Sequence, residues 1–223
     1  MNIFALSSNP HDSARMMLDK HVVKMPTETC QMLHTNILYM EYIEKHGKEP
    51  TLNELKVFHW HNDSPLMKPA MLNHPSTIWA RQSIANFDWL YQHGLALCNE
   101  FQLRYNKVHG TQLRINQCDA YQEITMHHNY PLKELTPVAI AMADEYRLDY
   151  DEWEQQNPNC NGWDFVIDSY RHYYLEGKWQ FADWKTQTPH WWPKNHIVNK
   201  HNARILAYNA KGKTQLKLLE EEQ

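Results

Sequence analysis

The sequence predicts a mainly α fold, a single compact helical domain with long loops and a basic C-terminal tail. Apolar residues recur at helical spacing through much of the chain, and neither strong strand alternation nor an internal repeat is visible. With 223 residues, 42% of them apolar, the chain can bury a sizeable core. We expect residues 1–193 to form the helical domain and residues 194–223 a basic extension.

The N-terminal region predicts an entry segment followed by a helix. Residues 3–6 are expected to form either a short strand or an extended entry. Asn9 is a good N-cap and Pro10 a good first helical residue, so a helix should begin there.

The next segment has two interpretations, which differ in the role of Pro26. Pro26 either kinks this helix or opens a second one, which would run to about Lys45. In the second case Glu28 lies in the first turn, where the helix dipole favours the ionised carboxylate.

The middle of the chain predicts a connection and a long helix. Residues 47–71 contain three prolines and suit a connection with one short helix at 53–58. A turn and cap at 73–76 should lead into one long helix from Thr77 to about Tyr105. Gly94, inside that helix, either costs stability or marks close packing.

Fewer helices are expected in the second half. We predict a short helix near residues 119–126, a loop or irregular turn over 135–150, and a helix from Trp163 to about Trp184. Residues 188–193 read as a rigid aromatic turn, and the tail from Asn195 should be partly helical.

Charge, the lack of a long apolar run and the cysteine content limit the classes of function that this protein can have. The net charge of −4 and a pI near 6.4 argue against a strong nonspecific hold on phosphates. The charge is uneven, because residues 194–219 carry cations without an acid while residues 144–154 are acidic. The chain shows no apolar run long enough to span a membrane and no signal peptide, so we expect a cytoplasmic protein without a membrane partner. The cysteines should be buried free thiols, namely Cys30, Cys98, Cys118 and Cys160.

The most informative segment is DKHVVKMPTETCQ, residues 19–31. On a helix, Lys20, His21, Lys24 and Glu28 fall on neighbouring turns of one broad face, which suits either a site or a solvated surface. Lys24 with Glu28 can be an ordinary helix ion pair. His21 can be a core histidine, or it can orient a phosphate or move a proton.

Other polar and aromatic candidates lie further along the chain. His59, His61, Asp63 and His74 resemble a metal cluster but lack the spacing of known zinc sites, so no metal or cofactor is expected. Arg81 either binds phosphate or caps the acidic faces.

Trp191 and Trp192 are expected to be exposed, because flanking prolines hold them in a turn. In that position they could stack on bases.

Two motifs carry a family resemblance. The first is D-K-H-V-x-K-M-x-x-E-T-x-Q at residues 19–31, and the second is H-P-x-x-x-W-x-R at 74–81, followed by L-A-L-C-x-E at 95–100. Together with E-Y-R at 145–147 and P-x-W-W at 189–192, they resemble a widespread family of mostly uncharacterised bacteriophage proteins.

A more distant resemblance is to the phage pyrimidine-dimer DNA glycosylase of the endonuclease V type, a small all-helical enzyme. Asp19, His21 and Glu28 match its D-x-H-x6-E segment. The resemblance implies that Glu28 is the catalytic carboxylate, that an N-terminal amine is the nucleophile, and that aromatic residues near the C-terminus contact DNA.

Two features depart from that family's pattern. Asn2 is too large for routine removal of the initiator, so Met1 should remain and supply the amine. Thr27 and Gln31 stand where the relative has basic residues beside its glutamate.

The expected function is therefore cleavage of the N-glycosidic bond of a damaged or modified pyrimidine in phage DNA, with or without lyase activity. A carboxylate stabilises positive charge on the sugar, and an amine traps C1′ as an imine. An α-amine, with a reference pKa of about 7.7–8.0, is a better nucleophile at neutral pH than a lysine at about 10.4.

The expected partner is duplex DNA carrying the altered base, in the host cytoplasm if the gene is a phage gene. The residues expected to contact DNA are Lys20, Lys24, Arg81, Trp191, Trp192, Lys200 and Arg204. Two alternatives stay open: a non-catalytic phage protein that binds nucleotides or nucleic acid against host defence, and a transferase or hydrolase acting on hypermodified phage DNA. The oligomeric state is left open.

Overall fold

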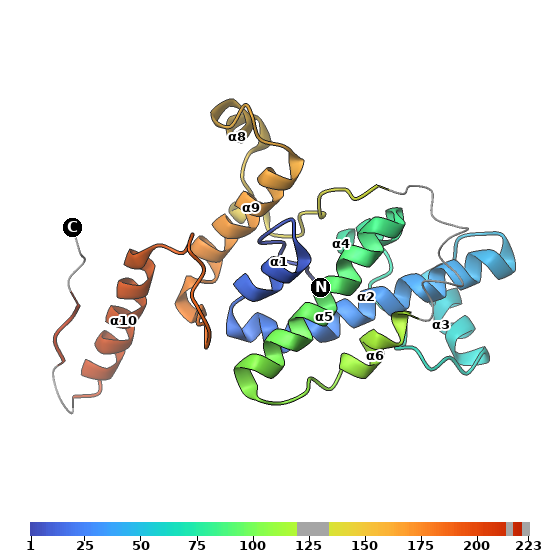
Figure 1. Ribbon diagram of the computed structural model, residues 1–223, viewed down its shortest axis with the longest axis horizontal. Coiled ribbons are helices and arrows are strands. Elements are labelled where there is room, and N and C mark those ends of the chain that lie inside the picture. The colour runs from blue at the N-terminus through green and yellow to red at the C-terminus, as the bar shows by residue number, and fades with distance from the viewer. Residues whose placement is uncertain (120–133, 213–215, 220–223) are drawn as a thin grey trace.

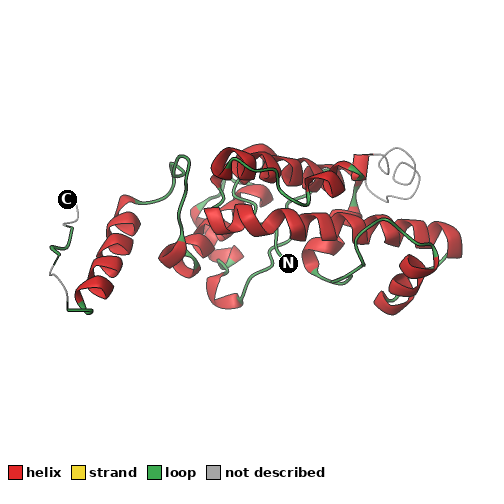
Figure 2. Cartoon of the chain, turned by 90° about the horizontal axis from the view of Figure 1, so that it is seen from below, coloured by secondary structure: helices red, strands yellow, loops and turns green. Residues whose placement is uncertain are grey.

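The computed structural model describes residues 1–119, 134–212 and 216–219, and every regular element in those ranges is a helix (Figures 1 and 2). The predicted mainly α class is confirmed. No helix within these ranges combines the length and the apolar character that a membrane crossing needs.

The chain enters the core as an irregular buried segment. Residues 3–6 form no strand, and Ile3, Ala5 and Leu6 are fully buried. Helix α1 (Pro10–Met16) begins as predicted, because the Asn9 carboxamide oxygen accepts the N–H groups of His11 and Asp12 at 2.9 and 3.1 Å.

Helix α2 (Asp19–His46) is the longest element and carries most of the candidate residues. It starts after a break at Met17 and Leu18 and runs through Pro26, so the expectation of a helix that opens at Pro26 is wrong. Glu28 lies nine residues after Asp19, in the third turn rather than the first, and the dipole argument does not apply to it.

The predicted long helix over residues 77–105 is two helices, α4 (Pro75–Gln82) and α5 (Ile84–Tyr105). Ser83 separates them with extended backbone angles of −146° and 155°, and its hydroxyl accepts the N–H of Asn86 at 3.0 Å. A serine that caps the next helix is a local signal for a break. Helix α3 (Leu52–His61) replaces the shorter one expected at 53–58.

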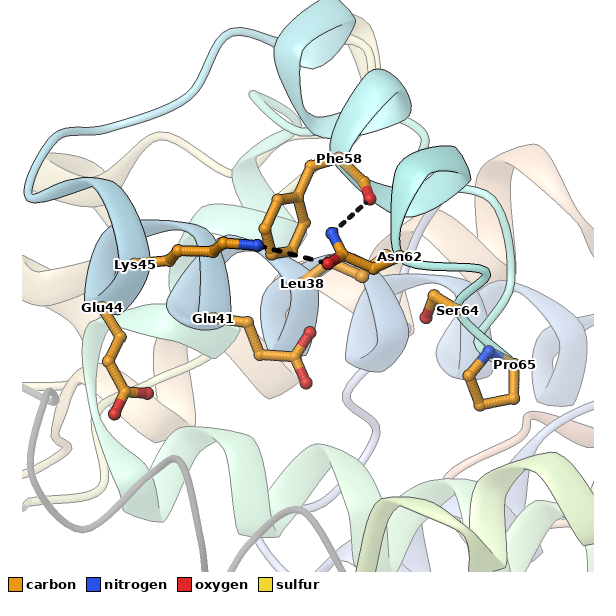
Figure 3. A pocket seen from close by; sticks show the side chains of 8 residues that line it. All are labelled: Leu38, Glu41, Glu44, Lys45, Phe58, Asn62, Ser64 and Pro65. Carbon is orange, nitrogen blue, oxygen red and sulfur yellow. Dashed lines mark hydrogen bonds between the residues drawn. The ribbon is translucent and has the colours of Figure 1, made fainter.

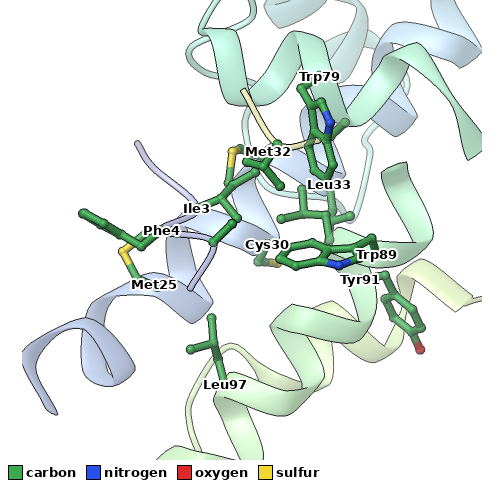
Figure 4. Packing of buried hydrophobic residues seen from close by; sticks show 14 of the residues in the cluster. Ile3, Phe4, Met25, Cys30, Met32, Leu33, Trp79, Trp89, Tyr91 and Leu97 are labelled. Carbon is green, nitrogen blue, oxygen red and sulfur yellow. The ribbon is translucent and has the colours of Figure 1, made fainter. Parts of the chain in front are cut away.

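The core lies where α2 packs against α4 and α5, and α1 packs on α5 (Figure 4). Gly94 marks close packing, because a Cβ at this position would lie 2.8 Å from Thr29 Cγ2 of α2. The side chains labelled in Figure 4 come from the N-terminal segment, α2, α4 and α5: Ile3, Phe4, Met25, Cys30, Met32, Leu33, Trp79, Trp89, Tyr91 and Leu97.

The second half holds short elements around one longer helix. Helix α6 (Gln112–Asn116) precedes residues 120–133, so the helix expected at 119–126 lies outside the described residues except for Asp119. The 3₁₀ turn η1 (Asp144–Tyr146) falls in the expected loop, and α8 (Tyr150–Gln156) was not predicted, although the N-cap Asp149 signals it.

Helix α9 (Gly162–Gly177) ends seven residues before Trp184, and the 3₁₀ turn η2 (Trp179–Phe181) follows it. Helix α10 (Lys194–Asn209) ends before Gly212, which has a φ of 72°. Figure 1 shows α10 at the opposite end of the molecule from α3. The division at residue 193 stays a prediction.

Candidate functional site

The carboxylate of Glu28 meets the N-terminal amine. Its Oε2 lies 3.8 Å from the Met1 amine nitrogen and accepts the backbone N–H of Asn2 at 3.1 Å. Its Oε1 pairs with Lys24 Nζ at 2.8 Å. The Glu28 side chain is 17% exposed, so it is largely enclosed but reachable from solvent.

The side chain of Asn2 holds the terminus in this place. Its Nδ2 donates to the carbonyl oxygen of Ala141 at 2.6 Å, and its Oδ1 accepts the hydroxyl of Tyr170 at 2.8 Å. The same Oδ1 accepts the N–H groups of Ile3 and Phe4. Tyr170 is fully buried on α9, so an element far along the chain positions the amine.

The side chain of Met1 is itself part of the packing. It is 5% exposed, and its sulfur lies 4.0 Å from the hydroxyl oxygen of Thr77 on α4. The residue as a whole is half-buried, so its remaining accessible surface lies mainly on the main chain, which carries the amine. The terminus therefore presents its amine while its side chain is anchored.

His74, which we considered above as a metal ligand and as part of a family motif, lies close enough to Glu28 and the terminal amine for both charges to act on its ring. It is the N-cap of α4, where its Nδ1 accepts the N–H of Ser76 at 3.2 Å. Burial, and then the positive terminal amine, hold the pKa of His74 below its ordinary value of 6.5, while Glu28 acts in the opposite direction. The sequence separates His74 from Glu28 by 46 positions, and no local signal joins them.

His21 has the surroundings of a core histidine. Its Nδ1 lies 2.6 Å from the Tyr174 hydroxyl, and its ring stacks on Phe4 with centroids 4.1 Å apart. Burial lowers the pKa of His21 to about 3, so the ring is neutral. Among the described residues it has no hydrogen bond to Glu28 or to the amine, and the core interpretation is favoured over the catalytic one.

Two acids from the motifs have a structural role. The side chain of Arg104 is fully buried and lies 3.1 Å from Asp19 and 2.9 Å from Glu100. It also donates to the carbonyl oxygens of Arg15 and Met17. This network ties the break between α1 and α2 to α5 and so sets where α2 begins.

The predicted lysine contacts on α2 remain accessible. Lys20 is exposed and lies 4.6 Å above the Phe181 ring, and the Lys24 side chain is 70% exposed. Arg81 is committed to protein contacts, because it donates to the Leu72 carbonyl oxygen at 2.6 Å and stacks 4.5 Å from the Tyr39 ring.

The prediction that the tryptophan turn is exposed is wrong. Trp192 is 6% exposed and Trp191 is half-buried. Trp192 packs edge-on against Trp184 at 4.9 Å, and the indole N–H of Trp191 points to Met16. Flanking prolines do form a turn here, but apolar burial directs the rings inward.

The basic residues of α10 are likewise engaged. Lys200 is buried, where it bonds to the Ala182 carbonyl oxygen and to the Asp183 carboxylate. Arg204 pairs with the other oxygen of Asp183 at 2.9 Å. This burial and pairing speak against the expectation that Lys200 contacts DNA, because its charge attaches α10 to the rest of the protein.

Neither metal ligation nor a reactive buried thiol is indicated in the described part of the chain. No three potential ligands gather there, and His59 instead bonds to the Leu66 carbonyl oxygen at 2.9 Å. Burial raises the pKa of Cys30 and of Cys98 to about 12. Three of the four free cysteines are buried, and Cys160 is exposed, contrary to expectation.

A cavity of about 390 Å³ lies elsewhere, between the C-terminal half of α2 and α3 (Figure 3). Lys45 Nζ donates to Asn62 across it at 3.3 Å. It contains none of the predicted site residues, and its lining is Leu38, Glu41, Glu44, Lys45, Phe58, Asn62, Ser64 and Pro65.

Comparison with known proteins relates the part of the chain that holds the amine and Glu28 to a known family. A family model described as pyrimidine dimer DNA glycosylase matches residues 1–113, which include Met1, Glu28 and His74. No curated protein and no solved structure matches the chain. The predicted relation to this glycosylase is confirmed. Because the match spans 113 of 223 residues, more than half of its length, the chain belongs to the pyrimidine dimer DNA glycosylase family.

Proposed function

We propose that the protein is a DNA glycosylase that releases damaged or modified pyrimidines, with the Met1 amine as nucleophile and Glu28 as the carboxylate that assists it. The observation that carries this proposal is the 3.8 Å separation between the amine nitrogen and Glu28 Oε2. Both groups fall inside the segment that matches the glycosylase family.

The chemistry needs a neutral amine and an anion beside it. The amine nitrogen attacks C1′, the glycosidic C1′–N bond breaks, and the base leaves with the bonding pair and takes up a proton. The alkylated nitrogen passes a proton to Glu28. The C1′–O4′ bond then opens, O4′ becomes a hydroxyl, and an imine joins Met1 to the sugar. Glu28 stabilises the positive charge that builds on the sugar.

Lyase activity is a further part of the proposal. The imine makes the C2′ proton acidic, and its removal expels the 3′ phosphate with the C3′–O bond pair. The target nucleotide must leave the base stack for C1′ to reach the amine. Lys20 and Lys24, exposed and four residues apart on α2, are the cations we assign to the DNA backbone.

Borohydride trapping on duplex DNA with pyrimidine dimers tests the proposal, since borohydride reduces an imine to a stable adduct. We expect the wild-type protein to form the adduct and Glu28→Gln to slow its formation roughly 10²-fold or more. A matched control is Glu54→Gln, which removes an exposed carboxylate of α3 paired with Lys48 and should leave the rate unchanged.

The alternatives give different results in the same assay. A non-catalytic binder would hold DNA with equal affinity in the wild type and in Glu28→Gln and would form no adduct. Mass spectrometry of the trapped protein locates the linkage. An adduct on Lys24 rather than on Met1 would contradict the assignment of the nucleophile.

A further inference from the structure

We propose that His74 is a substrate-positioning residue of this site, which stays neutral and donates a hydrogen bond from Nε2 to a sugar or phosphate oxygen of the target nucleotide. This inference rests on the proposed glycosylase function. It adds a residue from α4 to a site built from the N-terminus and α2.

The tautomer of His74 follows from its backbone contact. The N–H of Ser76 can only donate, and it lies 3.2 Å from His74 Nδ1, so this nitrogen is unprotonated. In the neutral ring the hydrogen is therefore on Nε2. Among the described residues Nε2–H has no hydrogen-bond acceptor and is not among the buried polar atoms that lack a partner, and His74 as a whole is half-buried, so a bound molecule can accept from this donor.

The position of His74 follows from α4. The His74 carbonyl oxygen accepts the N–H of Thr77 at 2.9 Å, which places both residues in the same turn. The Thr77 hydroxyl in turn contacts the Met1 sulfur at 4.0 Å. The first turn of α4 is thus packed on the residue that carries the amine, and Glu28 and the amine are the charges that act on the ring.

Neutrality matters for two physical reasons. A proton on Nδ1 would break the cap at Ser76, which loosens the turn that packs on Met1. It would also add a cation to a site that already holds the amine and Lys24 and in which the imine develops positive charge. A further cation of α4, Arg81, donates to the Leu72 carbonyl oxygen.

Two substitutions separate the donor from the cap. Asn and Asp are both good N-caps, so His74→Asn and His74→Asp should each keep the acceptor for Ser76 and preserve folding. Asn also offers an N–H donor that does not titrate, whereas Asp offers none. We expect His74→Asn to form the borohydride adduct within about threefold of the wild-type rate at pH 7.5, and His74→Asp to be roughly 10²-fold slower with the same melting temperature.

The pH profile tests whether the neutral ring is required, and the comparison of His74→Asn with His74→Asp separates its donor from its cap. As the pH falls, protonation of His74 should steepen the decline of log rate by one unit per pH unit, at a pH below the ordinary histidine value of 6.5 because burial lowers its pKa. The steeper part should be absent in His74→Asn. Equal rates for Asp and Asn, or superimposable wild-type and Asn profiles, would overturn the inference.

Failure of the glycosylase proposal is distinguishable from failure of this one. If no adduct forms with any variant, the proposed function itself is wrong. If the wild type and His74→Asp form it alike, only the role of His74 is wrong. An NMR titration of His74 in the free protein adds a test without DNA: moving the amine away with two residues before Met1 should raise the pKa of His74. An unchanged pKa would overturn the inference, because the ring would then not lie close to the amine.

Discussion

The hydroxyl of Tyr170 should control the site from α9, although it touches neither Glu28 nor the amine. It donates to Asn2 Oδ1 at 2.8 Å and accepts the N–H of Ala141 at 3.1 Å, and it is fully buried. The hydroxyl also lies 3.1 Å from the Ala139 carbonyl oxygen, and Tyr170→Phe removes all three contacts without changing the ring. One lost hydrogen bond costs about 1 kcal/mol, and the partly buried Ala141 N–H left without a partner costs up to roughly 1–3 kcal/mol more.

The expected loss of stability is therefore about 2–4 kcal/mol, which urea denaturation measures directly. The expected loss of activity is separate. Asn2 would no longer be held by Tyr170, and a shift of the amine by about 1 Å can cost roughly 10²-fold in rate. Borohydride trapping under single-turnover conditions, at a temperature where the variant is fully folded, measures this second effect.

Tyr174→Phe is the matched control, because Tyr174 is also fully buried on α9 but its hydroxyl bonds to His21. It should lose stability and keep the trapping rate. The reasoning fails if Tyr170→Phe traps DNA at the wild-type rate, or if both variants lose the same activity. A selective loss in Tyr174→Phe would instead restore the catalytic interpretation of His21.

Two further predictions concern stability. Arg104→Met should destabilise the protein by roughly 3–5 kcal/mol, because it leaves Asp19 and Glu100 near the core without their cation; a urea midpoint equal to that of the wild type would contradict the structural role of this network. Burial lowers the pKa of His21 and of fully buried His93 to about 3, compared with 6.5 in the unfolded chain. Their contribution to the stability of the fold is therefore fully present above pH 6.5 and is lost as the pH falls from 6.5 toward 3. Each histidine should add about 1.4 kcal/mol per pH unit to the slope of the unfolding free energy against pH. Urea unfolding between pH 7 and 4 measures it, and His93→Phe should have the shallower slope.

The sequence by itself determined the helical class and the helix starts that depend on local capping. Asn9 before Pro10 is a complete signal within two residues, and α1 begins at Pro10 as predicted, whereas α4 begins at Pro75, two residues before the predicted Thr77. The sequence also singled out Glu28 as a candidate, because its spacing from Asp19 and His21 carries the family resemblance.

Tertiary structure alone decided which charges are available. Lys200 and Arg204 look like DNA contacts in a basic run, but Asp183 engages both. Helical periodicity continues across Met17, yet the chain breaks there, since buried Arg104 binds its carbonyl oxygen.

The candidate site is also among the features that only tertiary structure decided. Met1, Glu28 and His74 are brought together by α2, α4 and the bond from Tyr170 to Asn2, which spans 168 positions. Capping and periodicity act over one or two turns and leave a trace in neighbouring residues. Charge pairing and burial act across space, so the partner of a given charge is set only when the helices pack.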